Sequence, residues 1–529
     1  MAPMKDYTDD GINDKTALMS DDEKSPDKDY TSDSFAAVSS VDQIVDSLNV
    51  GLFHYLIITA CGLGYAGYII YIQTLSLIVI TACELNITTA NKGWLSINFM
   101  IGLVASSSIF GRLADVYGRR KIVLITIFFN LVCSVASAFA YNYLMLVIMS
   151  GLIGCGYGGV NASIHSYVLE FFPRRYRGKA GGCMSGFLIL GSVFGALVAL
   201  AILPRSFNTH IGGITFTSWR IYLLITQIPS VIIFLMLLAM PKSLRFVLVK
   251  QDKKSAHQVL DKINQINSLC QSNQRKLKHH VELDWEMDLT YRQEENTFVR
   301  HIRKLLTPPW RKRLILLSIA WFGYCIGDQG FAIWLPTIIS FYVNGNTCRY
   351  HPHYYHNKSI SLNVIHHVSS NFSHCTSGEK LYTVAMNILI GNVLSIPIAL
   401  LCILLINRLG RKWLYCSMAS ICALCILMIL FIDTLLSTKI ISIIFLSFTV
   451  NVWIPFKIWS SELFCTEIRS TAVGILSVTG HIGSILGIVA FIVLFHVSCT
   501  ATLILFSMLG FLIAFTTLFL PDTTDADIK

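Results

Sequence analysis

The sequence predicts an all-α membrane protein whose helices form two pseudo-symmetric bundles of six. The chain is 54% hydrophobic and 14% charged, and its mean hydropathy is +0.59. A soluble protein of 529 residues could not bury that much apolar surface. Twelve apolar runs are long enough to cross a bilayer, and a polar interval separates the first six from the last six. Two matching groups are typical of membrane proteins built from internal repeats.

The twelve predicted spans define the domains of the chain. The first bundle, 51–240, contains runs near 52–80, 95–111, 122–141, 143–168, 180–204 and 219–240. The second bundle, 314–520, contains runs near 314–342, 381–406, 413–434, 438–460, 471–495 and 499–520. We expect the other segments to be a disordered acidic N-terminus (1–50), a central loop (241–313), an outer loop (343–380) and a short tail (521–529). Residues 1–50 are too acidic and too polar for a cleavable signal peptide.

The distribution of basic residues orients the predicted spans. The loops on one side of the membrane hold 28 Lys and Arg, and those on the other side hold seven. The positive-inside rule therefore places both termini and the central loop in the cytoplasm. N-glycosylation sequons at Asn86, Asn357 and Asn371 then lie on the opposite side, where the glycosylation machinery acts. This agreement supports the predicted orientation and a glycosylated outer loop.

The net charge of +10 does not indicate a nucleic-acid partner. Residues 1–50 carry a net charge of −8, and most of the positive charge elsewhere is the positive-inside signal. The acidic segment is poor in large apolar residues, so we expect it to be disordered. It could bind a basic cytoplasmic protein, or it could be a solvated tail without a partner.

The outer loop holds the cysteines and histidines that stand apart from the spans. Most of the fifteen cysteines lie in apolar runs, where they act as small packing residues. Cys348 and Cys375 share the polar loop on the oxidising side, so we predict a disulfide between them. Six histidines in this loop lack a diagnostic ligand spacing, and we predict no metal and no cofactor. No arrangement of nucleophile and base is visible, so we do not expect an enzyme.

The segment GRLADVYGRRK at 111–121 connects the second and third spans. Gly111 and Gly118 allow close helix approach and a tight reversal, and Asp115 can pair with a neighbouring cation or cap a helix N-terminus. An ordinary positive-inside loop would explain the basic residues but not the spacing of the glycines and the acid. The segment resembles the loop between helices two and three of major facilitator superfamily transporters.

Seven further segments narrow this resemblance. They are ELNITTANKGWL at 84–95, GCGYGG at 154–159, SWR at 218–220, WLP at 334–336, NRLGR at 407–411, ELF at 462–464 and RSTAVG at 469–474. Together they are similar to the synaptic vesicle glycoprotein 2 group, with the vesicle-related and organic-ion branches as close neighbours, over roughly residues 42–521. Relatives in that group carry a larger, repeat-built outer domain after span seven, whereas the loop here has fewer than forty residues.

The resemblance implies a major facilitator fold in which the two bundles rock about a central cavity and open it to each side in turn. We expect Glu170 to form a charge network with Arg177 at the cytoplasmic end of span four. Glu462 and Arg469 should form the matching network in span ten. Static ion pairs at the helix ends would use the same residues. The predicted gating residues are Gly111, Asp115, Gly118, Arg119, Arg120, Glu170, Arg177, Arg408, Arg411, Glu462 and Arg469.

The predicted cavity differs from that of the resembled group because the first span has no acid at 64–68. Asp328 in span seven and Lys457 in span ten are ionisable residues within spans, which makes them functional candidates. We predict that they face each other and separate when an anionic or zwitterionic solute binds Lys457. A fixed salt bridge, or a Lys457 side chain that reaches the cytoplasmic edge, are the alternatives. Aromatic residues that could line the same site are Tyr65, Tyr68, Trp334 and Trp453.

Two functions remain open. The resemblance implies a secondary active or facilitative transporter of a small organic solute, surrounded by lipid in a vesicle or plasma membrane. The alternative is a vesicle membrane protein with the same fold that acts mainly by recruiting partners through its acidic N-terminus. The unusual charges in the predicted cavity are compatible with altered specificity or with lost transport. No run of carbonyls or acidic ring indicates the filter of a channel.

Overall fold

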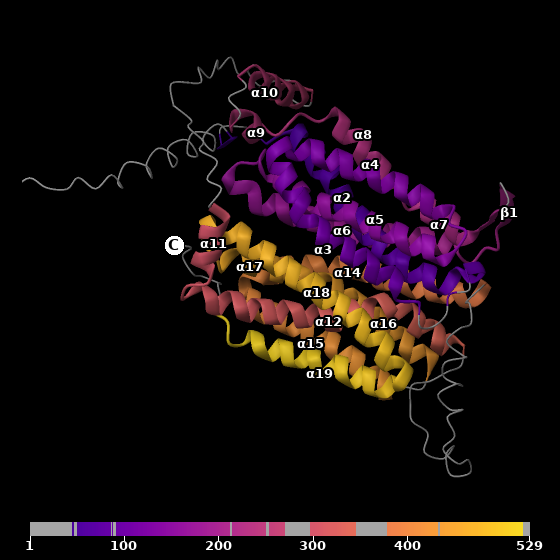
Figure 1. The fold of residues 1–529 in the computed structure, drawn as a ribbon. Coiled ribbons are helices and arrows are strands. Elements are labelled where there is room, and N and C mark those ends of the chain that lie inside the picture. Colours follow the sequence, from indigo (N-terminus) through magenta and orange to yellow (C-terminus); the bar gives the residue numbers. More distant parts are fainter. Residues whose placement is uncertain are drawn as a thin grey trace, which may run out of the picture.

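A computed structural model gives the fold of the chain (Figure 1). The structure describes residues 45–46, 50–85, 87, 91–211, 214–249, 253–269, 297–344, 378–431 and 434–521. Within these ranges, twelve helices are long and apolar enough to cross a bilayer, which confirms the predicted number of spans.

The first bundle contains six spans and ends in a broken helix. Its elements are α2 (Leu52–Thr81), η1 (Cys83–Leu85), α3 (Trp94–Tyr117), α4 (Arg119–Ala138), α5 (Tyr143–Leu169), α6 (Arg174–Ile202), β1 (Asn208–Ile211), β2 (Ile214–Thr217), α7 (Ser218–Ile225) and α8 (Ile228–Ala239). Pro229 lies in the first turn of α8, where its missing N–H leaves no helical hydrogen bond unmade. The antiparallel hairpin of β1 and β2, in which Asn208 pairs with Thr217, lies outside the predicted elements.

The second bundle repeats the six-span arrangement. Its elements are α12 (Trp310–Val343), α14 (Gly378–Leu409), α15 (Arg411–Met428), η3 (Ile429–Phe431), α16 (Leu435–Thr449), η4 (Val450–Val452), α17 (Trp453–Glu462), α18 (Thr466–Val497) and α19 (Cys499–Thr517). The tenth span consists of α16, η4 and α17. Pro455 in the first turn of α17 cannot donate a helical hydrogen bond, which explains why the pitch changes there.

Three short helices occupy the described part of the predicted central loop. They are α9 (Leu244–Val249), α10 (Lys253–Ser268) and α11 (Thr297–Leu305). The Asn267 Oδ1 atom of α10 accepts a hydrogen bond from the backbone N–H of Phe53 at 2.9 Å. Because the first N–H groups of a helix have no partner inside it, Asn267 satisfies one of these donors of α2. This segment therefore contains regular structure that holds it against the first bundle.

The two bundles use equivalent helix pairs. In the first bundle α2 packs on α6, α3 on α5, and α4 on α8. In the second bundle α12 packs on α18, α14 on α16, and α15 on α19. The bundles meet where α2 contacts α12, α6 contacts α14, and α3 contacts α18 (Figure 1). This arrangement confirms the predicted fold of two pseudo-symmetric six-helix bundles.

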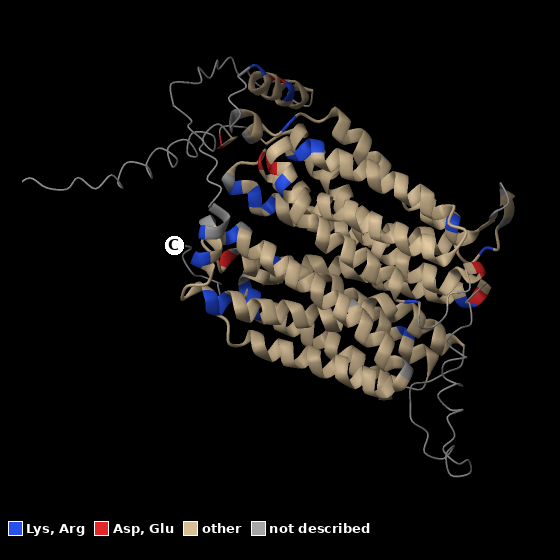
Figure 2. Cartoon of the chain, in the orientation of Figure 1, with Lys and Arg blue, Asp and Glu red and all other residues tan. Residues whose placement is uncertain are grey.

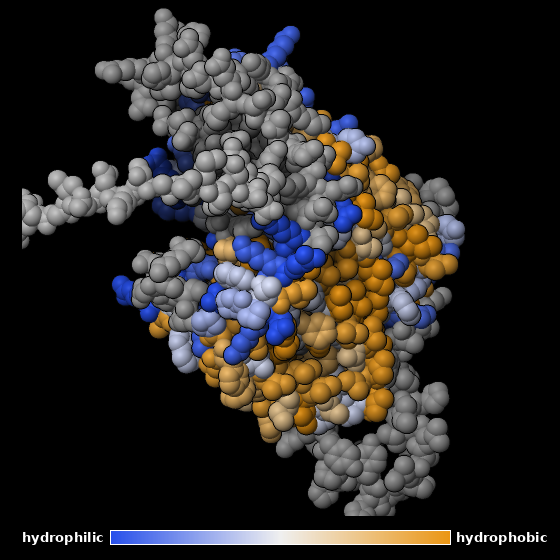
Figure 3. Space-filling model, turned by 60° about the vertical axis from the view of Figure 1, so that its left-hand side comes forward, coloured by the Kyte–Doolittle hydropathy of each residue, from blue (hydrophilic) through white to orange (hydrophobic). Residues whose placement is uncertain are grey.

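Charged residues gather at the two ends of the helices (Figure 2). We name the end that carries Arg119, Glu170, Arg411 and Glu462 the basic end, because Lys and Arg cluster there. The other end, which carries Glu84, is named the opposite end. Between the ends, large apolar side chains form an exposed surface (Figure 3). An exposed apolar surface of this extent matches a protein surrounded by lipid.

The buried apolar residues form two clusters. One cluster joins both bundles through the part of the first bundle near the opposite end, and it includes Tyr71 of α2, Trp219 of α7 and Phe491 of α18. The second cluster joins the first bundle to α9 and α10 near the basic end, where it includes Ile164 of α5, Leu237 of α8 and Ile263 of α10. The larger apolar cluster therefore connects the two bundles near the opposite end. Near the basic end, the first bundle is packed around a separate apolar cluster.

Several predicted features fall outside the described residues. They are the disordered N-terminus, the sequons at Asn86, Asn357 and Asn371, the disulfide between Cys348 and Cys375, and the side chain of Asp328. Among the described cysteines, Cys83 and Cys499 are disulfide-bonded and ten others are free. Both oxidised cysteines lie at the opposite end, and neither is among the residues predicted to form a disulfide.

Candidate functional site

The turn between α3 and α4 places the first charge pair of the basic end. Gly118 has a φ of 96°, a left-handed conformation that glycine adopts without strain. The next residue, Arg119, directs Nη1 to within 2.7 Å of Glu170 Oε1 at the end of α5. Arg119 Nη2 also lies 3.4 Å from Asp115 Oδ1, but Asp115 is 69% exposed whereas Glu170 is 9% exposed. Glu170 accepts a further hydrogen bond from the hydroxyl of Ser243.

The second bundle repeats this pair with a constant spacing of 292 positions. Gly410 has a φ of 86°, and Arg411 Nη2 lies 3.1 Å from Glu462 Oε1. The predicted partners also match, because Arg177 Nε donates to the carbonyl oxygen of Phe172 at 3.1 Å. Arg469 Nε donates in the same way to the carbonyl oxygen of Phe464 at 3.4 Å. Each described ion pair of this set lies inside one bundle.

The last span of each bundle joins the same network. Tyr167 Oη donates to the carbonyl oxygen of Pro241 at 2.6 Å, and Trp459 Nε1 donates to that of Pro521 at 3.2 Å. Tyr167 and Trp459 are also 292 positions apart, and the two prolines are 280 positions apart. The spacing therefore identifies equivalent positions in the two bundles.

The cation that follows the arginine of each ion pair in the sequence completes the network. Arg120 donates through Nε to the carbonyl oxygen of Leu237 at 2.9 Å and through Nη2 to that of Leu238 at 2.8 Å. Its equivalent Lys412 donates through Nζ to the carbonyl oxygen of Leu518 at 2.6 Å. A cation at these free carbonyls stabilises the C-terminus of a helix. We name these contacts of both bundles the basic-end network.

Two predicted gating residues lie outside this network. A Cβ atom at Gly111 would meet only the side chain of Ala162, at 3.8 Å, which is an ordinary contact. The close approach of α3 and α5 depends instead on Gly154, where a Cβ atom would lie 2.1 Å from the carbonyl oxygen of Phe99. Arg408 is exposed at the end of α14.

The candidate solute site centres on Lys457 of α17. Its Nζ lies 5.1 Å from the ring centroid of Tyr65 in the first bundle and 5.5 Å from that of Trp453. All three side chains are half-buried. A cation at this distance from aromatic faces is attracted to the ring electrons. Lys457 therefore connects the two bundles, and its predicted pairing with Asp328 remains a prediction because that side chain is not described.

The position equivalent to Lys457 is occupied by another basic side chain. His165 of α5 lies 292 positions before Lys457 and therefore occupies the equivalent position of the first bundle. Equivalent positions of the two bundles thus hold two unlike basic side chains. The prediction from sequence did not include His165, although the repeat spacing pointed to it. An imidazole and an ammonium group together can bind one carboxylate.

The remaining predicted aromatic residues pack away from Lys457. Tyr68 stacks on Phe99 with ring centroids 6.3 Å apart, and Trp334 stacks on Phe491 at 5.4 Å. Among the described residues, the Tyr68 hydroxyl and Trp334 Nε1 are buried without a hydrogen-bond partner. Such groups have a high cost unless water or a ligand binds them.

Polar amides in the spans form another feature that the sequence prediction missed. Asn392 Nδ2 of α14 donates to the carbonyl oxygen of Ser192 in α6 at 3.0 Å, which joins the two bundles. Both amide atoms of Gln73 and the Asn387 Nδ2 atom are buried without a partner in the described part of the chain. Uncharged amides within apolar runs were the signal for these positions.

Contacts at the opposite end give a structural role to two of the segments that carried the family resemblance, 84–95 and 218–220. Glu84 Oε1 accepts a hydrogen bond from Trp219 Nε1 at 2.6 Å and lies 3.6 Å from Arg220 Nε. Arg220 Nη1 donates to the carbonyl oxygens of Ala138 and Ala140 at 2.7 and 2.8 Å. Both segments therefore hold the first bundle together. At the same end, burial of the Lys92 ammonium group lowers the pKa of Lys92 to about 8.

Comparisons with known proteins agree with this architecture. The chain is 25% identical to the Organic cation/carnitine transporter 7 of Arabidopsis thaliana over 84% of this chain and 87% of that protein. It is 23% identical to the Synaptic vesicle 2-related protein of Rattus norvegicus, covering 92% and 81%. The Niacin transporter NiaP of Acinetobacter baylyi is 23% identical, covering 85% and 89%. These relatives confirm the predicted resemblance to the vesicle and organic-ion branches.

Solved structures and a family model identify the fold. A crystal structure of a D-xylose-proton symporter has a TM-score of 0.60, is 15% identical, and matches 91% of this chain and 100% of that one. The xylose transporter XylE from E. coli, in a partially occluded inward open conformation, has a TM-score of 0.57. The family model of the Major Facilitator Superfamily matches residues 55–347, more than half of the chain. The chain therefore belongs to the major facilitator superfamily, whose relatives indicate that it carries a solute across a membrane.

Proposed function

We propose that the chain transports a small organic solute that carries a carboxylate, as a secondary active or facilitative transporter that works by alternating access. The observation that carries this proposal is that Lys457 Nζ of the second bundle lies 5.1 Å from the ring centroid of Tyr65 in the first bundle. A solute held between them would contact both bundles at once. Its binding would therefore respond to their relative movement.

The surroundings of Lys457 suit an anion with an apolar or aromatic body. Placing an ammonium group within a membrane span has a cost of several kcal/mol, which the rings of Tyr65 and Trp453 offset only in part. A carboxylate would neutralise the charge through a charge-assisted hydrogen bond. The two rings would then contact the remainder of the solute. Niacin and carnitine, for which two relatives are named, both bear a carboxylate, and the plant relative is also named for organic cations.

The basic-end network would keep each bundle rigid while the bundles move. Its ion pairs and carbonyl contacts join helices of the same bundle. A network inside a bundle can persist through the transport cycle, so the predicted gating residues would act by holding the bundle together. The apolar core supports movement at the basic end, because there the first bundle has a separate cluster. By the positive-inside rule, this end faces the cytoplasm.

Uptake by the purified full chain in proteoliposomes tests the proposal. Vesicles would be supplied with radiolabelled carboxylates, zwitterions, amines and sugars, and we expect uptake of one carboxylate-bearing class. The variant Lys457→Met should abolish this uptake, while the control Lys121→Met, an exposed lysine at the start of α4, should retain it. Uptake restricted to amines or sugars would reject the solute class.

Folding must be separated from transport in this experiment. The variants should elute as single species in size-exclusion chromatography before their uptake is compared. A folded protein without flux for any class would favour the alternative function, an interaction protein that uses the transporter fold.

A further inference from the structure

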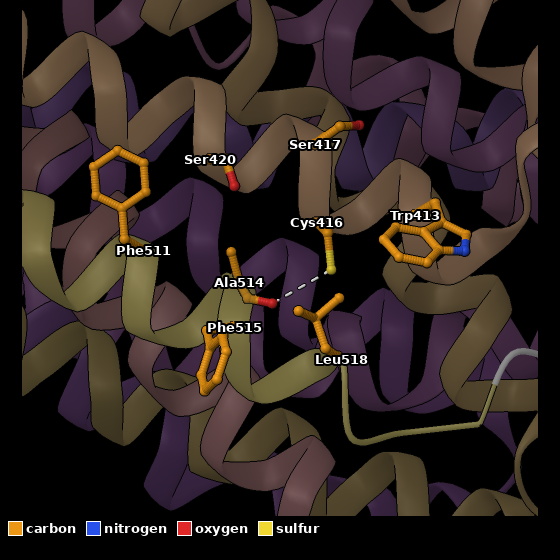
Figure 4. A pocket seen from close by; sticks show the side chains of 8 residues that line it. All are labelled: Trp413, Cys416, Ser417, Ser420, Phe511, Ala514, Phe515 and Leu518. Atoms are coloured by element: carbon orange, nitrogen blue, oxygen red, sulfur yellow. Dashed lines mark hydrogen bonds between the residues drawn. The ribbon is translucent and has the colours of Figure 1, made fainter.

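A groove of about 380 Å³ lies between α15 and α19 of the second bundle. Figure 4 shows Phe511 and Phe515 of α19 on one side, Trp413 of α15 on the other, and Cys416 and Ala514 between them. Trp413 is 56% exposed and Phe515 is 57% exposed. Because both helices cross the membrane, these aromatic side chains face lipid.

The first bundle shows that this groove is not a general consequence of the fold. Its equivalent helices, α4 and α8, carry Phe128 where α15 carries Ser420, at the spacing of 292 positions. They also carry Phe234 where α19 carries Ala514, at the spacing of 280. The rings of Phe128 and Phe234 lie with centroids 5.9 Å apart and fill the space between their helices. The groove exists because two phenyl rings are replaced by a hydroxymethyl and a methyl group.

Polar groups on the floor of the groove are partly used within the protein. Cys416 Sγ lies 3.4 Å from the carbonyl oxygen of Ala514, a contact drawn in Figure 4. It also lies 2.6 Å from Thr517 Oγ1. Because these groups bind one another, the floor of the groove, which consists of small side chains, is only weakly polar. An acyl chain can lie on such a surface without displacing a hydrogen bond.

A cation lies at the end of the groove nearest the basic end. Lys412 Nζ donates to the carbonyl oxygen of Leu518 at 2.6 Å and lies 5.7 Å from the ring centroid of Trp413. An ammonium group has three donors, so the contact with Leu518 leaves others for an anion. Arg408 is exposed one turn earlier in the chain, which adds positive charge at the same end.

We propose that this groove binds one anionic phospholipid. An acyl chain lies over Ser420 and Ala514 between the aromatic rings, and the phosphate is held by Lys412. The combination matches lipid sites in which an apolar cleft between membrane helices ends at basic side chains near the headgroup region. The site faces the bilayer, so it does not depend on the proposed transport of a solute.

Native mass spectrometry of the full chain in detergent tests this site by titration with phosphatidylserine and phosphatidylcholine. We expect one phosphatidylserine to remain bound to the natural chain. Ser420→Phe and Ala514→Phe, which introduce the side chains of the first bundle, should each weaken this binding at least about tenfold. Leu404→Phe, on an exposed position of α14 outside the groove, should leave it within about twofold.

A second variant separates the headgroup from the acyl chain. Lys412→Gln keeps a donor for Leu518 but removes the charge, so it should weaken phosphatidylserine binding about fivefold. It should weaken phosphatidylcholine binding less, because the choline cation offsets the charge of the phosphate that both lipids carry. Equal binding of phosphatidylcholine or cholesterol to the natural chain would overturn the proposal. So would unchanged phosphatidylserine binding in both phenylalanine variants. Each variant must first elute as a single folded species.

Discussion

Neutralising Glu170 should destabilise the protein far more than neutralising Asp115, although both carboxylates contact Arg119. Glu170 Oε1 is 2.7 Å from Arg119, and its side chain is 9% exposed. Exposed pairs contribute about 0–1 kcal/mol, whereas breaking a fully buried pair costs about 3–5 kcal/mol. We therefore expect Glu170→Gln to cost about 2 kcal/mol, between these limits. Asp115 lies 3.4 Å from Arg119 and is mostly exposed, so neutralising it should lower the free energy of unfolding by under about 0.5 kcal/mol.

The second bundle provides a replicate of this measurement. Arg411 and Glu462 are 3.1 Å apart, with side-chain exposures of 16% and 17%. The longer distance and greater exposure of the acid predict a cost for Glu462→Gln of about 1–2 kcal/mol. Both bundles should therefore depend on the acid at the end of span four or ten.

Titration with SDS in mixed micelles gives the relative free energies of unfolding of these variants. A double-mutant cycle with Arg119→Gln and Glu170→Gln isolates the energy of the pair from the other contacts of each residue. A coupling energy under about 0.5 kcal/mol would refute the argument from burial and distance. The same conclusion would follow if Asp115→Asn cost as much as Glu170→Gln.

Three other measurements address close packing, the opposite end and pH. Gly154→Ala should cost more than about 2 kcal/mol of stability, because its Cβ would overlap the carbonyl oxygen of Phe99. Gly178 has open space around it, so Gly178→Ala should stabilise its helix by up to about 1 kcal/mol. Thermal unfolding compares the two variants. Trp219→Phe should cost about 1.5–3 kcal/mol by losing a hydrogen bond to a carboxylate, and the same variant in a Glu84→Gln background should show a smaller loss. Lys92 has a folded pKa of about 8 against an ordinary value of 10.5, so the unfolded chain binds more protons between these values. Stability should rise with pH across this interval, and a Lys92→Met variant that keeps the full rise would contradict this prediction.

The membrane spans could be predicted from sequence because a bilayer requires long, continuous apolar runs. Short elements at the ends of the spans cannot be predicted in this way, because no long apolar run marks them. The hairpin at β1 and β2 depends on four-residue strands, and α10 depends on contacts such as Asn267 with Phe53. The disulfide-bonded state of Cys83 and Cys499 was missed because each cysteine lies at the edge of an apolar run and resembles the packing cysteines inside it.

The site was predicted in its residue types more than in its pairings. The motif at 111–121 and its repeat placed Arg119 and Arg411 correctly at the turns before α4 and α15. The ion pair described for Glu170 is made with Arg119 at the start of α4, and the predicted network of Glu170 with Arg177 stays a prediction. Side-chain direction at a helix end decides such pairings, and spacing alone does not contain it.

The two bundles act as internal controls for each other, and their differences are more informative than their agreement. At the basic end the same contacts recur, which indicates a requirement of the fold. At the equivalent positions 165 and 457 the bundles hold His165 and Lys457, so both side chains are basic but their chemistry differs. A requirement of folding alone would not select two unlike basic groups at equivalent positions within a membrane, where each has a cost. This asymmetry agrees with the proposed transport of a solute that carries a carboxylate at one end.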